Sequence, residues 1–463
     1  MPAIITKDFR VHNAKQFEES FGETADTYYL AIGRPQAFAD NQAFNDGTDA
    51  SPPTPVDSVG SVEYYAYDDF LSAKKITSSD VSLVIPRRNW TTGTTYDYYR
   101  HDYGDINSAG SVISANSGAT SLYDATFYVM NSTFDVYKVI DNNGDSASTV
   151  EPSGNKSTSV FSTGDSYKWK YMYSLSASEQ ANFLSTDFMH VSTESSDFST
   201  TGGAIEHVKI TAGGSGGTNG TYTGVDIRGD GSSGKATIVV SSNAVSSVTI
   251  TTAGSGYTYA SVKASDFGSV SGADIDFIIS PPGGHAADVV TELGGFFVMT
   301  NVDLTQADGS GDFSTGNDFR RIALLRNPTD STTGSTASAT TLDATKSITF
   351  SGTPGSFQAD EKITQATTGA VGFVVDFNST TKVLRYVQPQ FADQGVDSDG
   401  NLTAFASTHT VTGATSSATG TPSSHDTTPE LTHDTGDILY IENRKPISRA
   451  ADQTENVKLI VEF

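Results

Sequence analysis

One glycine motif in the chain has the spacing of a nucleotide-binding loop. Residues 229–234 read GDGSSG, which matches the pattern G-x-G-x-x-G. A dinucleotide site needs a strand before this motif and a helix after it, because the pyrophosphate binds at the N-terminus of that helix. The residues that follow, 236–240 (ATIVV), are typical of a strand. We therefore interpret the motif as a turn and expect no nucleotide cofactor.

Two acidic loops, at residues 141–145 (DNNGD) and 397–401 (DSDGN), resemble calcium-binding loops in composition. An EF-hand loop has glycine at its sixth position and glutamate at its twelfth. These loops have serine and proline there in the first case, and leucine and threonine in the second. We favour hairpin turns stabilised by Asp and Asn side chains, with a weak calcium site as the alternative.

No other residues have the pattern of a catalytic or metal site. The eight histidines are scattered, and the nearest two, His425 and His433, are too far apart for a metal-binding pair on one helix. The chain has no cysteine, which excludes disulfides and thiolate chemistry. Its 54 acidic residues are too numerous for any carboxylate pair to stand out. We expect no catalytic residues, no metal and no cofactor, and therefore no enzyme.

Positive charge and large aromatic side chains gather in three segments, at residues 87–103, 167–173 and 444–449. Arginine and tyrosine are enriched at protein interfaces, where they combine contact area, hydrogen bonds and charge. The alternative is that these cations pair with acids of the same chain. The predicted partner-contact residues are Arg87, Arg88, Trp90, Tyr98, Tyr99, Arg100, Tyr167, Trp169, Tyr171, Arg444, Lys445 and Arg449.

The densest apolar and aromatic sequence lies between residues 123 and 191. Residues 126–130 and 134–140 are rich in β-branched and aromatic side chains, and the short polar segment between them predicts a hairpin. Residues 167–173 alternate, with four aromatic rings on one face and two lysines and a methionine on the other, as in a strand. The ring face belongs to a core or an interface. Ser176 and Glu179 then form a capping box, which predicts a short helix.

Towards the N-terminus the patterns predict two helices and two strands. Asn13 can cap a helix that extends to residue 21 and has Ala14, Phe17 and Phe21 on one face. Residues 68–75 have acids first and lysines last, as the helix dipole prefers, and predict the second helix. The strands are predicted at residues 27–33 and 82–85.

Two blocks rich in glycine, serine and threonine interrupt the aromatic sequence. The first, from residue 202 to 282, contains a near-repeat at 207–216 and 247–256. The second runs from about residue 331 to 424. We expect each block to be a small inserted β module. The predicted parts are residues 1–86 with 320–331 and 425–463, residues 87–202 with 283–319, the module 203–282 and the module 332–424.

Composition sets the class of the protein. The 463 residues include 43 Gly, 25 Phe and 20 Tyr, which together with abundant Ser and Thr favours an all-β architecture with minor short helices, a layered β-sandwich core and the two inserted modules. The net charge of −26 disfavours direct binding to nucleic acid or to an anionic membrane. No stretch has the length of a membrane span or the pattern of a signal peptide, so we expect a soluble protein that is not exported by the secretory route.

Several segments resemble the β-sandwich baseplate wedge subunit of T-even-type contractile-tailed bacteriophages. The matching segments lie within about residues 1–200, 284–330 and 430–463, and the two Gly/Ser/Thr blocks depart from the family pattern. The segments are residues 1–6 (MPAIIT), 17–21 (FEESF), 75–81 (KITSSDV), 84–90 (VIPRRNW), 98–103 (YYRHDY), 124–129 (DATFYV), 167–173 (YKWKYMY) and 436–443 (GDILYIEN).

This resemblance implies a virion protein, made in the host cytoplasm, that forms a homodimer and contacts other wedge proteins. It implies a role in holding the baseplate together and in its rearrangement when the tail contracts, without catalysis. Two alternatives remain. A tail-fibre or adhesin-type receptor binder would use the inserted modules to contact host glycans, and a polysaccharide-degrading enzyme would use a carboxylate.

Overall fold

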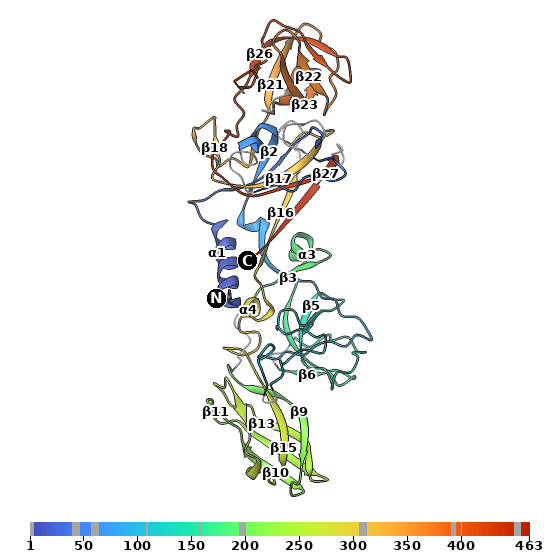
Figure 1. Cartoon of the computed structure of the whole chain (residues 1–463), viewed down its shortest axis with the longest axis vertical. Helices are drawn as coiled ribbons and strands as arrows, with labels where there is room; N and C mark the ends of the chain where they lie inside the picture. Colours follow the sequence, from blue (N-terminus) through green and yellow to red (C-terminus); the bar gives the residue numbers. More distant parts are fainter. Residues whose placement is uncertain are drawn as a thin grey trace. The chain divides into compact units, whose positions relative to one another are not determined.

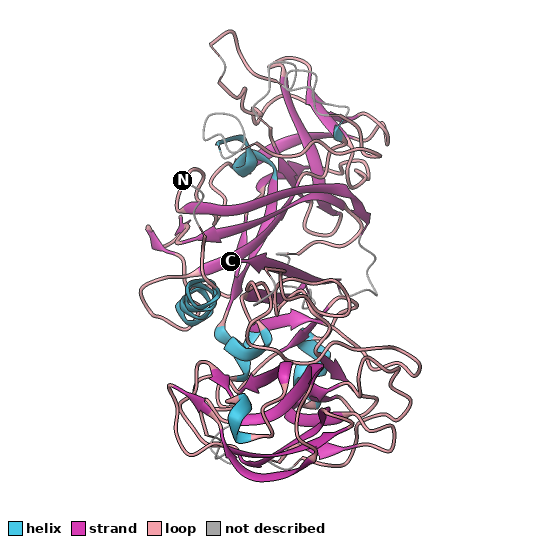
Figure 2. Ribbon diagram, turned by 60° about the horizontal axis from the view of Figure 1, so that its bottom comes forward, coloured by secondary structure: helices cyan, strands magenta, loops and turns pink. Residues whose placement is uncertain are grey.

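The computed structural model consists mainly of strands, with a few short helices (Figure 1; Figure 2). The predicted all-β class is confirmed. Within the described part of the chain, no helix is long and apolar enough to cross a membrane. The structure describes residues 4–38, 47–56, 64–107, 110–156, 159–193, 201–304, 313–389, 395–399, 401–448 and 455–463.

The chain divides into two compact units, each assembled from segments that are distant in the sequence. Unit 1 comprises Met1–Gln16, Ser82–Met299 and Ile460–Phe463. Unit 2 comprises Phe17–Val81 and Thr300–Leu459. Unit 1 therefore holds the whole aromatic stretch between residues 123 and 191.

In unit 1 the aromatic stretch forms an antiparallel sheet in the order β4-β5-β7-β6, followed by helix α3. The bounds are β4 (Tyr128–Met130), β5 (Asp135–Asp141), β6 (Phe161–Ser162), β7 (Lys168–Ser174) and α3 (Ala177–Phe183). The predicted hairpin and third strand are confirmed, and Lys138 of β5 lies opposite Lys170 of β7. The capping box of Ser176 and Glu179 is also present. Because Lys170 and Met172 are buried like the aromatic rings, both faces of this sheet are covered.

The first glycine-rich block forms three small antiparallel sheets in unit 1 (Figure 1). They pair β9 (Ile205–Ser215) with β15 (Ser271–Ile279), β12 (Lys235–Ser241) with β10 (Gly220–Asp226) and β13 (Ala244–Thr252), and β11 (Arg228–Gly229) with β14 (Ala260–Ser261). Tyr257 is buried at the centre of the block, 3% exposed, and hydrogen-bonds through its hydroxyl group to the carbonyl of Ile227 (3.0 Å). A side chain at Gly231 or Gly254 would collide with this ring, so these turns require glycine.

In unit 2 a five-stranded antiparallel sheet has the order β20-β2-β1-β17-β27. Its strands are β1 (Tyr28–Gly33), β2 (Phe70–Ile76), β17 (Asp318–Arg326), β20 (Thr341–Asp343) and β27 (Asp437–Ser448). The short helices α2 (Tyr64–Ala66) and η3 (Tyr67–Asp69) precede β2. The strands β18 (Thr329–Asp330) and β19 (Ser335–Thr336) form a separate small pair. The helix predicted at residues 68–75 was wrong, because most of this segment is β2. Phe70, Leu71 and Ala73 are buried between two paired neighbours, so strand pairing overrides the local charge pattern.

The second Thr/Ser/Gly block forms a closed six-stranded barrel, also in unit 2 (Figure 1). The order around the barrel is β21 (Lys346–Ser351), β24 (Val383–Val387), β23 (Ala370–Asn378), β22 (Lys362–Gln365), β25 (Val411–Gly413) and β26 (Thr419–Asp426). Ile348, Val374, Leu384 and Tyr386 fill its interior. Closure leaves no free strand edges, which would otherwise be open to pairing with other chains.

A further sheet has the order β28-β16-β3-β8. Its strands are β3 (Val81–Pro86), β8 (Phe188–His190), β16 (Phe297–Leu304) and β28 (Glu455–Glu462). The short helices η4 (Ser78–Asp80) and α4 (Val289–Leu293) precede β3 and β16, whereas η5 (Ala264–Asp266) lies between β14 and β15 in the first glycine-rich block. The first helix, α1 (Lys7–Ser20), begins six residues earlier than predicted from Asn13. Thr6 lies at its start, where its carbonyl and hydroxyl oxygens accept the N–H groups of Arg10 and Phe9.

Candidate functional site

Six of the twelve predicted partner-contact residues lie in the interior of unit 1, each less than a tenth exposed. These six are Tyr98, Tyr99, Arg100, Tyr167, Trp169 and Tyr171. The guanidinium group of Arg100 donates to the carboxylates of Asp102 (2.6 Å) and Asp276 (2.8 Å). This cation therefore pairs with acids of its own chain, and the aromatic members pack in the core.

Arg87, Arg88 and Trp90 are only partly buried. Arg87 donates to the carbonyl of Ser185 (2.8 Å) and to the side-chain oxygen of Asn89 (3.0 Å), and Arg88 donates to the carbonyls of Tyr123 (3.1 Å) and Ala125. The guanidinium group of Arg88 also lies over the Tyr128 ring. None of these contacts is to an acid, so they do not neutralise the positive charge of either side chain. These three side chains stay candidates for contact with a partner.

Arg444 and Lys445 are exposed near the end of β27, the last strand in the order of its sheet. Arg444 lies 3.3 Å from the carboxylate of Glu442, with both groups at least a third exposed. Such an exposed pair is weak, because water and salt screen it. Arg449 lies outside the described residues.

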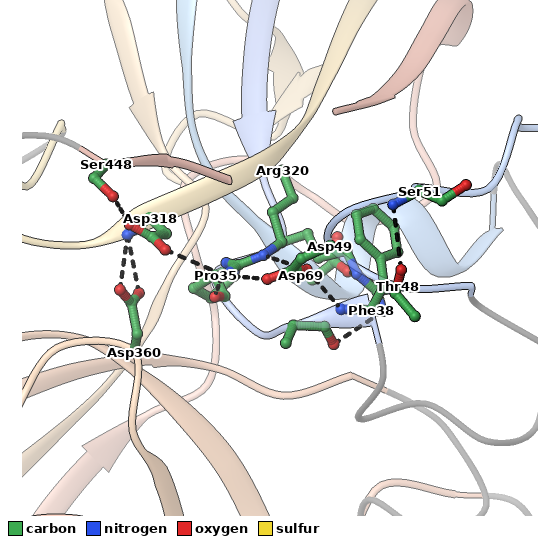
Figure 3. A network of polar contacts seen from close by, with 12 residues as sticks. Pro35, Phe38, Thr48, Asp49, Ser51, Asp69, Asp318, Arg320, Asp360 and Ser448 are labelled. Atoms are coloured by element: carbon green, nitrogen blue, oxygen red, sulfur yellow. Dashed lines mark hydrogen bonds and ion pairs between the residues drawn. The ribbon is translucent and has the colours of Figure 1, made fainter. Parts of the chain in front are cut away.

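A polar network in unit 2 was not predicted from the sequence (Figure 3). Arg320 of β17 is 6% exposed, and its guanidinium group binds both carboxylate oxygens of Asp49, at 2.9 and 3.0 Å. It also donates to the carbonyl of Pro35. Burial acts to raise the pKa of Asp49, but the hydrogen bonds from Arg320 and from the Phe38 N–H hold this pKa below its usual value. Since Asp49 and Arg320 are about 270 residues apart, no sequence spacing indicates the pair.

The network continues to the barrel through Asp318 and Asp360 (Figure 3). The N–H of Asp318 donates to both carboxylate oxygens of Asp360, at 3.1 and 2.8 Å, and Ser448 donates to the carboxylate of Asp318 (2.6 Å). Burial, followed by the negative charge of Asp318, raises the pKa of Asp360 to about 7. The connection between the barrel and β17 therefore contains a carboxyl group that titrates near neutrality.

Replacing Asp360 with asparagine should remove a pH dependence from the stability of unit 2. Between pH about 4 and 7 the unfolded chain releases the Asp360 proton while the folded chain keeps it, so the stability of the wild type falls as the pH rises through this window. Asparagine can still accept the Asp318 N–H and tolerates the left-handed backbone at this position (φ 63°). Urea unfolding at pH 4.5 and 8 should show a smaller loss of stability for Asp360→Asn than for the wild type, and equal losses would contradict the assignment.

Both acidic loops are turns held by aspartate side chains, but only the second is a hairpin turn as predicted, between the bridged residues Val396 and Leu402. The first follows β5, which pairs with β4 and β7 and not with the next strand, β6. In the first, the Asn143 N–H donates to the carboxylate of Asp141 (3.0 Å), and in the second the N–H groups of Asp399 and Asn401 both donate to Asp397 (2.9 Å). Residues 229–234 likewise connect two strands, β11 and β12, so the glycine motif is a turn. The described residues include no group of three or more His, Asp or Glu side chains that could hold a metal ion.

Comparison with known proteins supports the resemblance seen in the sequence. Residues 3–149, about a third of the chain, match the family model described as Phage-Gp8: Bacteriophage T4, Gp8. No curated protein matches the chain. The matched region includes Arg87, Arg88 and Trp90 and ends just after the predicted hairpin. The resemblance predicted from the sequence is thereby confirmed, and residues 3–149 carry the sequence pattern of a T4-type baseplate wedge protein.

Proposed function

We propose that this chain is a structural subunit of a phage tail baseplate wedge and acts through protein contacts. The observation that carries the proposal is the match of residues 3–149 to the Gp8 family. The partly exposed side chains of Arg87, Arg88 and Trp90 lie within the matched region and are available for such contacts. Its location is then the virion tail.

The proposed subunit is a homodimer that also contacts other wedge proteins and rearranges with them when the tail contracts. The test is the solution mass of the purified chain by light scattering over a range of concentrations, followed by mixing with the other wedge proteins. A stable dimer that co-assembles is expected. A monomer that fails to co-assemble would overturn the proposal, and a trimer that binds host cells would favour a receptor-binding protein.

We place one contact surface on the exposed part of β27. This strand pairs with β17 on one side, and Leu439, Arg444 and Lys445 are exposed on it, with Leu439 43% exposed. On a chain with net charge −26, an exposed pair of cations attracts acidic surfaces, including that of a second copy. Leu439 would supply a small apolar contact, and Arg444 and Lys445 would bind acidic side chains of the partner.

Reversing both charges, Arg444→Glu with Lys445→Glu, should weaken assembly without unfolding the chain. Like charges would then face each other across the contact, and we expect the dissociation constant of the dimer or of the wedge complex to rise at least about tenfold, measured by analytical ultracentrifugation. The matched control is Lys235→Glu with Lys263→Glu, which changes the net charge equally at exposed positions in the first glycine-rich block. Equal weakening in both variants would show that only the total charge matters.

We also propose that residues 203–282 and 332–424 are peripheral modules, except that β20 within the second block belongs to the five-stranded sheet of unit 2. For the first, the two ends of the block meet: a side chain at Gly202 would lie only 2.6 Å from the backbone nitrogen of Gly283. Deleting residues 203–282 removes Asp276 but leaves Arg100 paired with Asp102. The shortened chain should remain a folded dimer by circular dichroism and light scattering, whereas aggregation would show that the block belongs to the core.

A further inference from the structure

A lysine, a histidine and a glutamate are buried together in unit 1. Lys138 lies on β5, His285 precedes α4, and Glu292 lies on α4. Their exposed fractions are 0%, 3% and 6%. Removing a charged lysine and a carboxylate from water is unfavourable even when the two groups form a pair. The cluster therefore needs an explanation that the structural role does not supply.

The side chains of Lys138 and His285 and the backbone N–H of Ala286 contact the carboxyl group of Glu292. Lys138 Nζ contacts both Glu292 Oε1 and His285 Nδ1. His285 Nδ1 is 3.2 Å from the same oxygen, Oε1, and the Ala286 N–H donates to the other oxygen, Oε2, at 2.7 Å. The ring of Tyr99 covers the lysine, with Nζ 4.2 Å from the ring centroid. The amine thus faces a carboxyl group whose two oxygens have different partners.

This arrangement provides the parts of an acyl-transfer reaction. In a buried site, transfer of the ammonium proton to the carboxylate removes two buried charges and leaves a nucleophilic amine beside a carboxylic acid. The Ala286 N–H is placed to stabilise negative charge on Oε2. Burial lowers the pKa of His285 well below its usual value, and the nearby Lys138 and Lys170 lower it further, so its imidazole is neutral. An amine nitrogen that has attacked a carboxyl carbon is far more acidic than an ordinary ammonium group, so it can pass a proton even to this weak base.

We propose that Lys138 and Glu292 form an intramolecular amide bond. Nζ attacks the carboxyl carbon Cδ, and the Nζ–Cδ bond forms while the Cδ–Oε1 bond breaks. His285 Nδ1 takes a proton from Nζ and passes one to Oε1, which leaves as water. The Cδ=Oε2 group becomes the amide carbonyl. A cavity of about 470 Å³, lined in part by Tyr99 and Glu292, lies next to the pair and can receive the water.

The bond would be a covalent cross-link within unit 1, which cannot form a disulfide instead. The chain has no cysteine, so a disulfide is excluded. The two residues are about 150 positions apart. The bond would join β5 of the aromatic sheet to α4, which follows the first glycine-rich block in the sequence. A cross-link that closes so long a loop restricts the unfolded chain strongly.

The test is mass spectrometry of the full-length wild-type chain, first intact after denaturation and then after trypsin digestion. The intact chain should have a mass lower than the sequence mass by one water, about 18 Da. Peptide mapping should find a branched peptide that joins the Lys138 and Glu292 segments, with no cleavage after Lys138. Free peptides from both segments and no branched peptide would overturn the proposal. A missing water that maps to an Asp-Gly sequence would also overturn it, because succinimide formation there loses the same mass.

Two lysine variants make the assignment specific. Lys138→Met cannot form the amide and should have its full sequence mass. Lys170→Met removes the buried lysine directly opposite on β7 and should still lose one water. A branched peptide in Lys138→Met would place the bond elsewhere. In His285→Gln the unlinked chain should accumulate, and complete linkage in that variant would refute the proton transfer through the imidazole.

Discussion

Replacing Asp69 with alanine is expected to lower the free energy of unfolding of unit 2 by about 3–5 kcal/mol. The Asp69 side chain is fully buried, and its carboxylate binds Arg321 (2.7 Å) and Gln36 (3.1 Å), with Arg34 at 4.0 Å. Burial raises the pKa of Asp69, and the two arginines partly oppose this. Without Asp69 two guanidinium groups remain buried without their shared acid, which costs more than the loss of the bonds alone. Urea unfolding followed by circular dichroism measures the change.

The matched control for Asp69 is an ion pair made by a second arginine of β17, the strand that contains Arg321. Arg326 of β17 lies 2.6 Å from Asp437, but the two side chains are 41% and 58% exposed. Asp437→Ala should therefore change the stability by no more than about 1 kcal/mol. Equal losses in the two variants would contradict the view that burial makes the Asp69 pairs important. Asp69→Asn, which keeps the shape and one acceptor, should fall between them.

Features with local sequence signals were predicted well. The capping box at Ser176 and the alternation in residues 167–173 each depend on residues a few positions apart, and the structure has both the helix and the strand. The turn at residues 229–234 was recognised because the residues after it cannot begin a helix. Patterns of this kind are sufficient for the fold class of a chain made of short strands.

Features that depend on distant residues could not be predicted. Residues 68–75 have a charge pattern typical of a helix, but pairing with β1 and β20 makes most of them a strand. Arg100 was predicted as a partner contact, yet besides Asp102, two residues away, it pairs with Asp276 of the first glycine-rich block, 176 residues later. Lys170 was placed on a face opposite the aromatic rings, but that face is buried too. Only the three-dimensional arrangement shows which cations have partners inside the chain.

Replacing Trp169 with alanine is expected to lower the free energy of unfolding of unit 1 by about 3–5 kcal/mol. The indole ring is fully buried, stacks on Tyr167 with centroids 5.4 Å apart, and donates from Nε1 to the hydroxyl of Thr163 (3.1 Å). Truncation leaves a large cavity beside the rings of Tyr167 and Tyr96, because neighbouring side chains on paired strands can close it only in part. Thermal and urea unfolding by circular dichroism would report the loss.

The chain provides its own comparison, since it has only two tryptophans. Trp90 is partly exposed and makes a similar hydrogen bond, from Nε1 to the hydroxyl of Ser148 (3.1 Å). Because both indoles donate one hydrogen bond to a serine or threonine hydroxyl, the difference between the two variants isolates the burial of the ring. We expect Trp90→Ala to cost about 1–2 kcal/mol, less than half the loss in Trp169→Ala. If Trp90→Ala were as damaging in the isolated chain, Trp90 would be a core residue and would have to be withdrawn from the candidate partner contacts. A small effect on stability combined with weaker assembly would instead place Trp90 at the interface with a wedge partner.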